Sequence, residues 1–201
     1  MTVSRRAFAL GTAAIAAVAA MPASAQSALS AEDRAVLAQA QTYLQGLTGA
    51  ASVETLIVDT VAKANSAYVE WAIKSAEAVF IAGGDQSDYL NQWQGTKVQD
   101  ALVHVYNKGG AVGGTSAGNH VLGQFIYDPD GVAGAISAEA VTDFCHETIN
   151  ISTGFLNFPA LQGVINDTHF RQRDRMGRSM VFQAKVGAAS RVVAISEATS
   201  L

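Results

Sequence analysis

The pentapeptide Gly114-Thr115-Ser116-Ala117-Gly118 decides how this chain folds around its site. It follows a short apolar run after Gly110 and precedes a segment compatible with a helix. A Gly-x-Ser-x-Gly turn between a strand and a helix bends the backbone sharply, lifts the serine Oγ out of the sheet edge and points a helix N-terminus at a developing negative charge. Because small residues also form plain turns, the motif alone leaves both a catalytic serine and a structural turn open.

Strand and helix patterns alternate along the chain on both sides of this turn. Apolar runs predict strands at 53–58, 78–81, a short segment ending at Gly113, 148–152, 163–165 and 191–195. Helical spacing predicts helices at 65–74, 97–107 after a Thr96 cap, 117–124, 137–144 and 171–185. Such alternation is typical of an α/β fold, and we expect a mainly parallel sheet sandwiched by helices.

The first 25 residues have the pattern of an export signal. Ser4-Arg5-Arg6-x-Phe8 supplies a positive start and favours the bacterial twin-arginine route, 7–20 is a short apolar stretch, and 23–25 is a small-residue cleavage site. The apolar stretch is too short to span a bilayer. We therefore expect a periplasmic or secreted bacterial protein with no stable membrane span.

Composition limits the rest of the chain to one catalytic domain. The 201 residues suffice for one well-buried core, and we expect an amphipathic helical segment at 26–50 before a domain at 51–201. The net charge of −4 becomes −6 once the two arginines of the leader, which has no acidic residue, are removed. This charge gives no basic footprint for nucleic acid. The single Cys145 excludes an intramolecular disulfide and predicts a buried free cysteine.

A glycine loop, Gly83-Gly84-Asp85-Gln86, follows the predicted strand at 78–81. The carboxyl ends of parallel strands place ligand-binding loops, but a plain turn with a helix cap at Asp85 is the more common origin of such a pattern. If this loop and Ser116 lie at one sheet edge, their amides form a two-donor oxyanion hole. The candidate donors are Gly84, Asp85 and Ala117.

The segment 167–178 gathers His169 and four arginines after another predicted strand. Arg171, Arg175 and Arg178 have helical spacing, which is typical of a solvated helix face. Alternatively, a histidine at a strand end can act as the base for Ser116, and fixed guanidinium groups suit recognition of substrate carboxylates.

Three blocks together resemble the cyanophycinase and dipeptidase E family of serine peptidases. They are Phe80-Ile81-Ala82-Gly83-Gly84-Asp85-Gln86, the pentapeptide at 114–118, and Asp167-x-His169-Phe170-x-x-Arg173-x-Arg175-x-Gly177-Arg178. They are similar to the glycine loop, the nucleophile elbow and the histidine block of that family. The last block is the most specific and favours the cyanophycinase branch.

The resemblance implies a role for each matching residue. Ser116 would be the nucleophile and His169 the general base, and Glu197, in a segment similar to the family's later acidic segment, is the candidate to orient His169. Glu139 and Glu147 remain rival acids. The order Ser, His, Glu differs from that of ordinary α/β-hydrolases, so the constellation is a similar one on another α/β fold. The resemblance implies a three-layer fold of the class I glutamine amidotransferase type. Residues implied to line or brace the substrate site are Gln86, Asp167, Arg173, Arg175 and Arg178.

The resemblance runs from 51 to 201 and departs from the family at both ends. Family members begin with a strand and a glycine-rich turn, whereas 26–50 is predicted to be helical, so we expect a central strand to be absent. The chain also ends soon after the acidic segment, where family members continue. Uncovered backbone groups or apolar faces would make such a fold unstable, dimer-dependent or inactive.

The leading functional hypothesis is an exported serine peptidase that cuts β-aspartyl-arginine units of cyanophycin or a similar peptide, with a homodimer as a possible assembly. It needs no cofactor, and His104, His120 and His146 lack a convincing metal-ligand spacing. The alternative is a catalytically inactive homologue that binds peptides in the cell envelope. A weaker third hypothesis, lipid carriage, rests only on the pattern at 29–49.

Overall fold

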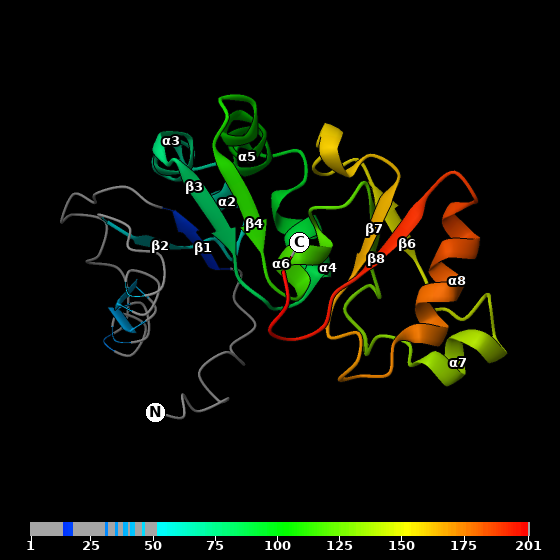
Figure 1. Cartoon of the computed structure of the whole chain (residues 1–201). Helices are drawn as coiled ribbons and strands as arrows, with labels where there is room; N and C mark the ends of the chain where they lie inside the picture. Colours follow the sequence, from blue (N-terminus) through cyan, green and yellow to red (C-terminus); the bar gives the residue numbers. More distant parts are fainter. Residues whose placement is uncertain are drawn as a thin grey trace.

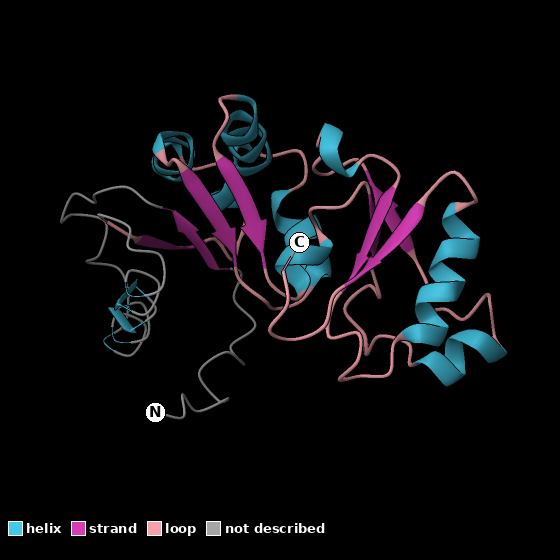
Figure 2. Ribbon diagram, viewed as in Figure 1, coloured by secondary structure: helices cyan, strands magenta, loops and turns pink. Residues whose placement is uncertain are grey.

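Two four-stranded sheets lie side by side in the computed structural model, with helices between and around them (Figure 1 and Figure 2). The structure describes residues 52–200, the strand at 14–17 and seven helical positions between 31 and 46. None of the helices among these residues has the length and apolar character needed to cross a membrane. The described positions within 26–50 are all helical.

The first sheet has the order β2-β1-β3-β4 and the second the order β6-β5-β7-β8. The strands of the first sheet are β1 Ala14–Ala17, β2 Glu54–Ile57, β3 Ala78–Ile81 and β4 Ala111–Gly114. The strands of the second are β5 Phe125–Tyr127, β6 Ile151–Thr153, β7 Val164–Asp167 and β8 Arg191–Ala194. The helices are α2 Val61–Ala64, α3 Ala67–Ser75, α4 Gln86–Trp93, α5 Lys97–Asn107, α6 Ala117–His120, α7 Ser137–Thr142, the 3-10 helix η3 Pro159–Leu161 and α8 Met176–Val186.

The strands that carry the candidate site pair in parallel. β3 pairs with β4, β5 with β7 and β7 with β8 in this way, whereas β1 is antiparallel to both of its neighbours and β6 is antiparallel to β5. The structure therefore confirms an α/β fold with parallel strands around the site. It differs from the expected single sheet: the strands form two sheets, and the short helix α6 packs against both β4 and β7.

Strand β1 lies within the segment predicted to be an export leader. Ala14 pairs with Ile57 of β2, and Ile15 pairs with Ile81 of β3. Ala14–Ala17 thus forms a strand between β2 and β3, whereas the family resemblance predicted that a central strand is absent. A run of alanine and isoleucine satisfies both interpretations, since short apolar runs are found in signal peptides and in buried strands alike. Export therefore remains a prediction, and removal of residues 1–25 would take β1 out of the sheet.

The first hydrophobic core joins the first sheet to α3, α4 and α5. Helix α5 buries Val98, Ala101, Leu102 and Val105, which recur at the spacing of one helical face. Trp93 of α4 is fully buried and donates from Nε1 to the carbonyl oxygen of Val58 at 2.9 Å. A smaller core around β5, β7 and α8 includes Tyr127, Ile165 and Phe182.

Several predicted elements have different bounds in the structure. Helix α8 begins at Met176, five residues later than predicted, because 171–174 form turns. The predicted helix at 117–124 is shortened to α6, and β5 follows it. Helix α4 was not predicted as a helix, although Asp85 caps it as the turn interpretation suggested, accepting from the Ser87 N–H at 2.9 Å. Cys145 is exposed, so the prediction of a buried cysteine is wrong.

Two glycines allow β4, α6 and the end of β3 to approach one another. A Cβ on Gly118 would collide with the carbonyl oxygens of Ile81 and Ala82, and one on Gly114 would collide with the carbonyl of Gly118. These backbone oxygens cannot move aside as the end of a flexible side chain can. The close packing of α6 on β3 and β4 therefore requires glycine at both positions.

We predict that Gly118→Ala destabilises the protein by about 3 kcal/mol or more, because the added methyl forces backbone atoms apart. Gly113→Ala is the matched control, because a Cβ on Gly113 meets no heavy atom within 4 Å. The free energy of unfolding, measured by urea denaturation followed by circular dichroism, should be nearly unchanged in this control. Equal stability of the two variants would contradict the packing described for α6.

Candidate active site

Ser116, His169 and Glu197 form a hydrogen-bonded chain across the two sheets. The Ser116 Oγ lies 3.0 Å from Nε2 of His169, and Nδ1 of the same ring lies 3.2 Å from Oε1 of Glu197. Ser116 follows β4, His169 follows β7 and Glu197 follows β8, so each side chain is placed at the carboxyl end of a parallel strand. The arrangement has the geometry of a nucleophile, a base and an orienting acid.

Two of the three hydrogen-bonded residues, Ser116 and His169, have left-handed backbone conformations. Ser116 has φ 52° and ψ −121° in the turn from β4 into α6, and His169 has φ 51°. Non-glycine residues in such conformations cost about 1–3 kcal/mol each and persist where the surrounding structure holds them. Such strain is found most often at functional sites, which supports a role for the pair beyond folding.

The glycine loop after β3 packs directly against Ser116. A Cβ on Gly83 would lie 3.1 Å from Cβ and 3.7 Å from Oγ of Ser116. Gly84 and Asp85 line a cavity together with Ser116, and Ala117 is the first residue of α6, where a helix N–H has no intrahelical acceptor. The structure therefore brings together the three residues predicted to supply oxyanion donors.

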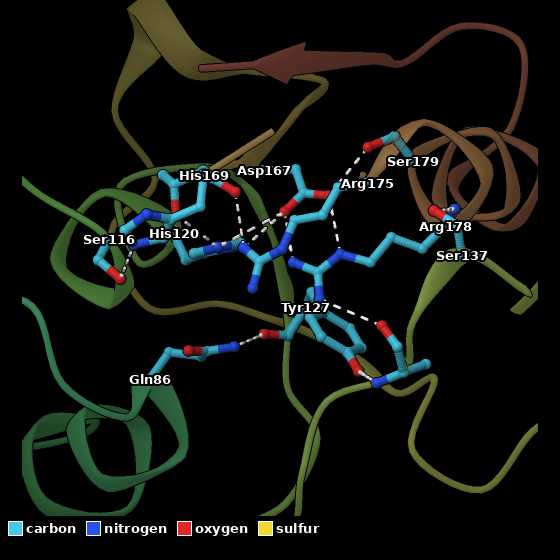
Figure 3. A network of polar contacts seen from close by, with 12 residues as sticks. Gln86, Ser116, His120, Tyr127, Ser137, Asp167, His169, Arg175, Arg178 and Ser179 are labelled. Atoms are coloured by element: carbon cyan, nitrogen blue, oxygen red, sulfur yellow. Dashed lines mark hydrogen bonds and ion pairs between the residues drawn. The ribbon is translucent and has the colours of Figure 1, made fainter. Parts of the chain in front are cut away.

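A buried carboxylate organises the arginines behind the site (Figure 3). Asp167 is fully buried at the end of β7, and Arg178 donates to both of its oxygens, through Nε at 3.0 Å and through a second guanidinium nitrogen. The Ser179 hydroxyl donates to Asp167 at 2.9 Å, and Arg175 donates to Asp167 at 3.3 Å and to the carbonyl oxygen of Thr168 at 2.6 Å. Asp167 thus ties the end of β7 to Arg175 and to α8, and Arg175 in turn holds the Thr168 carbonyl next to His169.

The predicted substrate-binding residues have two different environments. Asp167 and Arg178 are buried, and Asp167 acts as a brace. Gln86 donates from Nε2 to the carbonyl oxygen of Tyr127 at 2.8 Å, which links α4 to β5. Arg173 is exposed and Arg175 half-buried. A cavity of about 170 Å³ beside Ser116 is lined by four of the five predicted residues: Gln86, Arg173, Arg175 and Arg178.

The rival acids lie elsewhere. Glu139 is in α7 and accepts from the Ile136 N–H at 3.1 Å, which is a helix-capping contact. Glu147 is exposed in a turn before β6. Glu197 is the carboxylate bonded to the His169 ring, so the geometry selects it among the three candidates.

Burial is the main cause that lowers the pKa of both histidines near Ser116. Burial lowers the pKa of His169, the Glu197 hydrogen bond opposes this, and the charges of Arg173 and Arg175 lower the pKa further. Burial lowers the pKa of His120 to about 3, and the charge of Asp167 offsets only part of this effect. A neutral His169 is the form that can accept a proton.

A second, larger cavity was not predicted from the sequence. It has a volume of about 650 Å³, and it is bordered by Ser116, His169, the segment 195–200 and a largely apolar wall. The residues of that wall come from β3, α5, β4, the turn after α6, and η3 with the preceding Phe158, and they have no shared sequence motif. Only the fold brings them together.

The sequence is similar to known peptidases over most of its length. The model of Peptidase family S51 matches residues 18–201, which extends the similarity seen from position 51 onward in the sequence. A cyanophycinase from Nostoc sp. and one from Trichormus variabilis are each 31% identical over 132 residues, covering 65% of this chain and 40% of the relative. The aligned part thus spans well under half the length of the curated relatives. The match across nearly the whole chain confirms the resemblance: the protein belongs to Peptidase family S51.

Proposed function

We propose that the protein is a serine peptidase of the cyanophycinase type that hydrolyses aspartyl peptides, including β-aspartyl-arginine units, through an acyl-enzyme on Ser116. The observation that carries this proposal is the hydrogen-bonded chain from Ser116 Oγ through His169 to Glu197, with separations of 3.0 and 3.2 Å. Membership of Peptidase family S51 supports the reaction class.

In the acylation step, the Ser116 hydroxyl loses its proton to Nε2 of His169 as Oγ bonds to the substrate carbonyl carbon. His169 then gives this proton to the departing nitrogen, and the carbon–nitrogen bond breaks. Glu197 accepts the hydrogen bond from Nδ1 and stabilises the imidazolium. In deacylation, His169 takes a proton from water, whose oxygen attacks the ester, and returns the proton to Ser116 Oγ.

The turn at Ser116 acts as a nucleophile elbow in this proposal. Its left-handed backbone exposes Oγ between the end of β4 and the start of α6. The amide of Ala117 and an amide of Gly84 or Asp85 would stabilise the carbonyl oxygen as it becomes negative. Loss of one such donor typically slows catalysis by about 10²–10³-fold. This strand-turn-helix and the helices packed on the parallel strands favour a three-layer fold similar to that of class I glutamine amidotransferases.

An acidic residue suits the smaller cavity. Arg173 and Arg175 line it, and Arg175 remains protonated at neutral pH although burial lowers its pKa to about 10. Guanidinium groups bind carboxylates through paired hydrogen bonds. The similarity to cyanophycinases suggests the β-aspartyl-arginine linkage, which the charges alone do not specify.

The proposal includes export, and the competing hypothesis is an inactive homologue. The leader pattern at 1–25 supports export to the periplasm or medium, although cleavage would remove β1. An inactive peptide-binding homologue is less well supported, because the three reactive groups are already within hydrogen-bonding distance.

We predict that the purified protein releases dipeptides from cyanophycin, or cleaves aspartyl peptides, and that Ser116→Ala lowers the rate by about 10³-fold or more because the attacking oxygen is lost. Products are measured by mass spectrometry. Ser190→Ala removes a hydroxyl outside both cavities and should leave the rate unchanged. Equal rates for the parent and Ser116→Ala would refute the proposed nucleophile, and no cleavage by the parent would favour the inactive homologue.

We predict opposite pH shifts for two variants near His169. Activity requires neutral His169, so kcat/KM should fall as the pH drops through the pKa of His169, which lies below the ordinary value of about 6.5. Arg173→Ala removes a charge that lowers this pKa, so the acid limb should move to higher pH. Glu197→Gln removes a hydrogen bond and a charge that raise the pKa, so the limb should move to lower pH.

The measurement is kcat/KM from about pH 5 to 8. Arg171→Ala is the matched control, since Arg171 is exposed in the same turn and is not among the groups that shift the pKa of His169. Shifts of the two test variants in the same direction would argue against His169 as the base.

A further inference from the structure

Ser116 lies between two cavities of different chemistry. It borders both the cavity of about 170 Å³ and the cavity of about 650 Å³. Arg173 and Arg175 line only the smaller one, whereas His169 lines only the larger one. The two halves of a substrate bound across Ser116 would therefore meet different surfaces.

The proposed mechanism assigns a direction to these surfaces. The departing nitrogen must lie where His169 can protonate it, which is the side of the larger cavity. The carbonyl oxygen must face Gly84 and Asp85, which line the smaller cavity. The acyl residue then extends toward the arginines, and the leaving residue extends into the larger cavity. This assignment rests on the proposed acyl-enzyme mechanism at Ser116, and it does not rest on the β-aspartyl-arginine linkage, in which arginine follows the aspartyl residue.

The wall of the larger cavity is mainly apolar and aromatic. Tyr106 and Phe158 stack with ring centroids 4.4 Å apart, and Phe80 is 42% exposed on β3. The remaining apolar wall side chains are those of Val112, Leu122, Leu161, Ala160, Ile195 and Ala198. No lysine or arginine lines this cavity among the described residues, and its acidic residue, Glu197, is already bonded to His169.

The edge of β4 gives this cavity a backbone docking surface as well. The Ala111 and Thr115 N–H groups donate to carbonyl oxygens of Glu77 and Ile81, on the β3 side. Because successive residues of a strand face opposite neighbours, the backbone groups of Val112 and Gly114 face the other edge, and both residues line the cavity. An extended peptide can pair with such an edge.

We propose that the larger cavity is the leaving-side subsite of the peptidase and that it selects an apolar side chain. The preferred substrates then carry an acidic residue before the cleaved bond and a residue such as leucine or phenylalanine after it. Burial of that side chain against the aromatic wall provides the selectivity, and arginine loses hydration there without gaining a free carboxylate partner.

The test compares kcat/KM for Asp-Leu, Asp-Phe and Asp-Arg peptides, each in the α and the β linkage, with amine release measured by mass spectrometry. We expect the leucine and phenylalanine peptides of at least one linkage to exceed their arginine counterpart by about 10-fold or more. Equal values, or a preference for arginine, would overturn the inference while leaving the peptidase proposal intact. Absence of Ser116-dependent cleavage of every peptide would overturn both.

A charge placed in the wall provides the second arm of the test. Leu161→Glu should move the leucine-to-arginine ratio of kcat/KM toward arginine by about 10-fold, and Leu161→Ala should lower only the leucine value. Met180→Glu is the control, because Met180 is 65% exposed on α8 and lines neither cavity. The ratio does not depend on the fraction of folded enzyme. An unchanged ratio in both Leu161 variants would overturn the inference.

Discussion

The buried carboxylate of Asp167 is the constraint on which the rest of the site depends. It lies at the end of β7 and accepts hydrogen bonds from Arg175, at the end of the turn that follows, and from Arg178 and Ser179 in α8. His169 lies two residues beyond Asp167, so the same contacts set the position and the strained backbone of the proposed base. A buried ion pair contributes little net stability, because desolvation offsets much of the attraction. We infer that its value here is a unique geometry for the turn.

Side-chain contacts between the two sheets complete this geometry. Helix α6 packs against β4 and β7, and α4 reaches the second sheet through Gln86, which donates to Tyr127, and through Ser87, which donates to Asp128. Ser116 and His169 come from different sheets, so their 3.0 Å separation depends on these links. The strain at both residues is sustained by packing on both sides. The site therefore forms only when the two sheets are assembled.

The sequence predicted local elements more successfully than their arrangement. β3 and α5 have the predicted bounds because their apolar spacing is regular, and Ser116, His169 and Glu197 lie together. The start of α8 was mispredicted, since the helical spacing of the arginines reflects pairing with Asp167 by Arg175 and Arg178. β5 has three residues, which are too few to show the alternating apolar pattern that predicts a strand. The apolar cavity has no sequence signal because its wall comes from several elements that are far apart in the sequence.

The segment 14–17 shows most clearly why pattern alone is insufficient. Its apolar residues fit a leader, and in the fold they pair with both β2 and β3. The same residues belong to the predicted leader and to β1, so cleavage of the leader would remove a strand from the first sheet. A sheet lacking β1 would leave edges of β2 and β3 open to another strand, which is the physical basis for considering a homodimer.

The most direct test of this account is labelling of the parent protein with a fluorophosphonate that reacts with activated serines, followed by intact-mass analysis and peptide mapping. We predict a single adduct on Ser116 that is lost in His169→Ala and slowed in Glu197→Gln, because the base and its orienting acid activate Oγ. No adduct, an adduct on another residue, or equal labelling of the parent and His169→Ala would contradict the central claim.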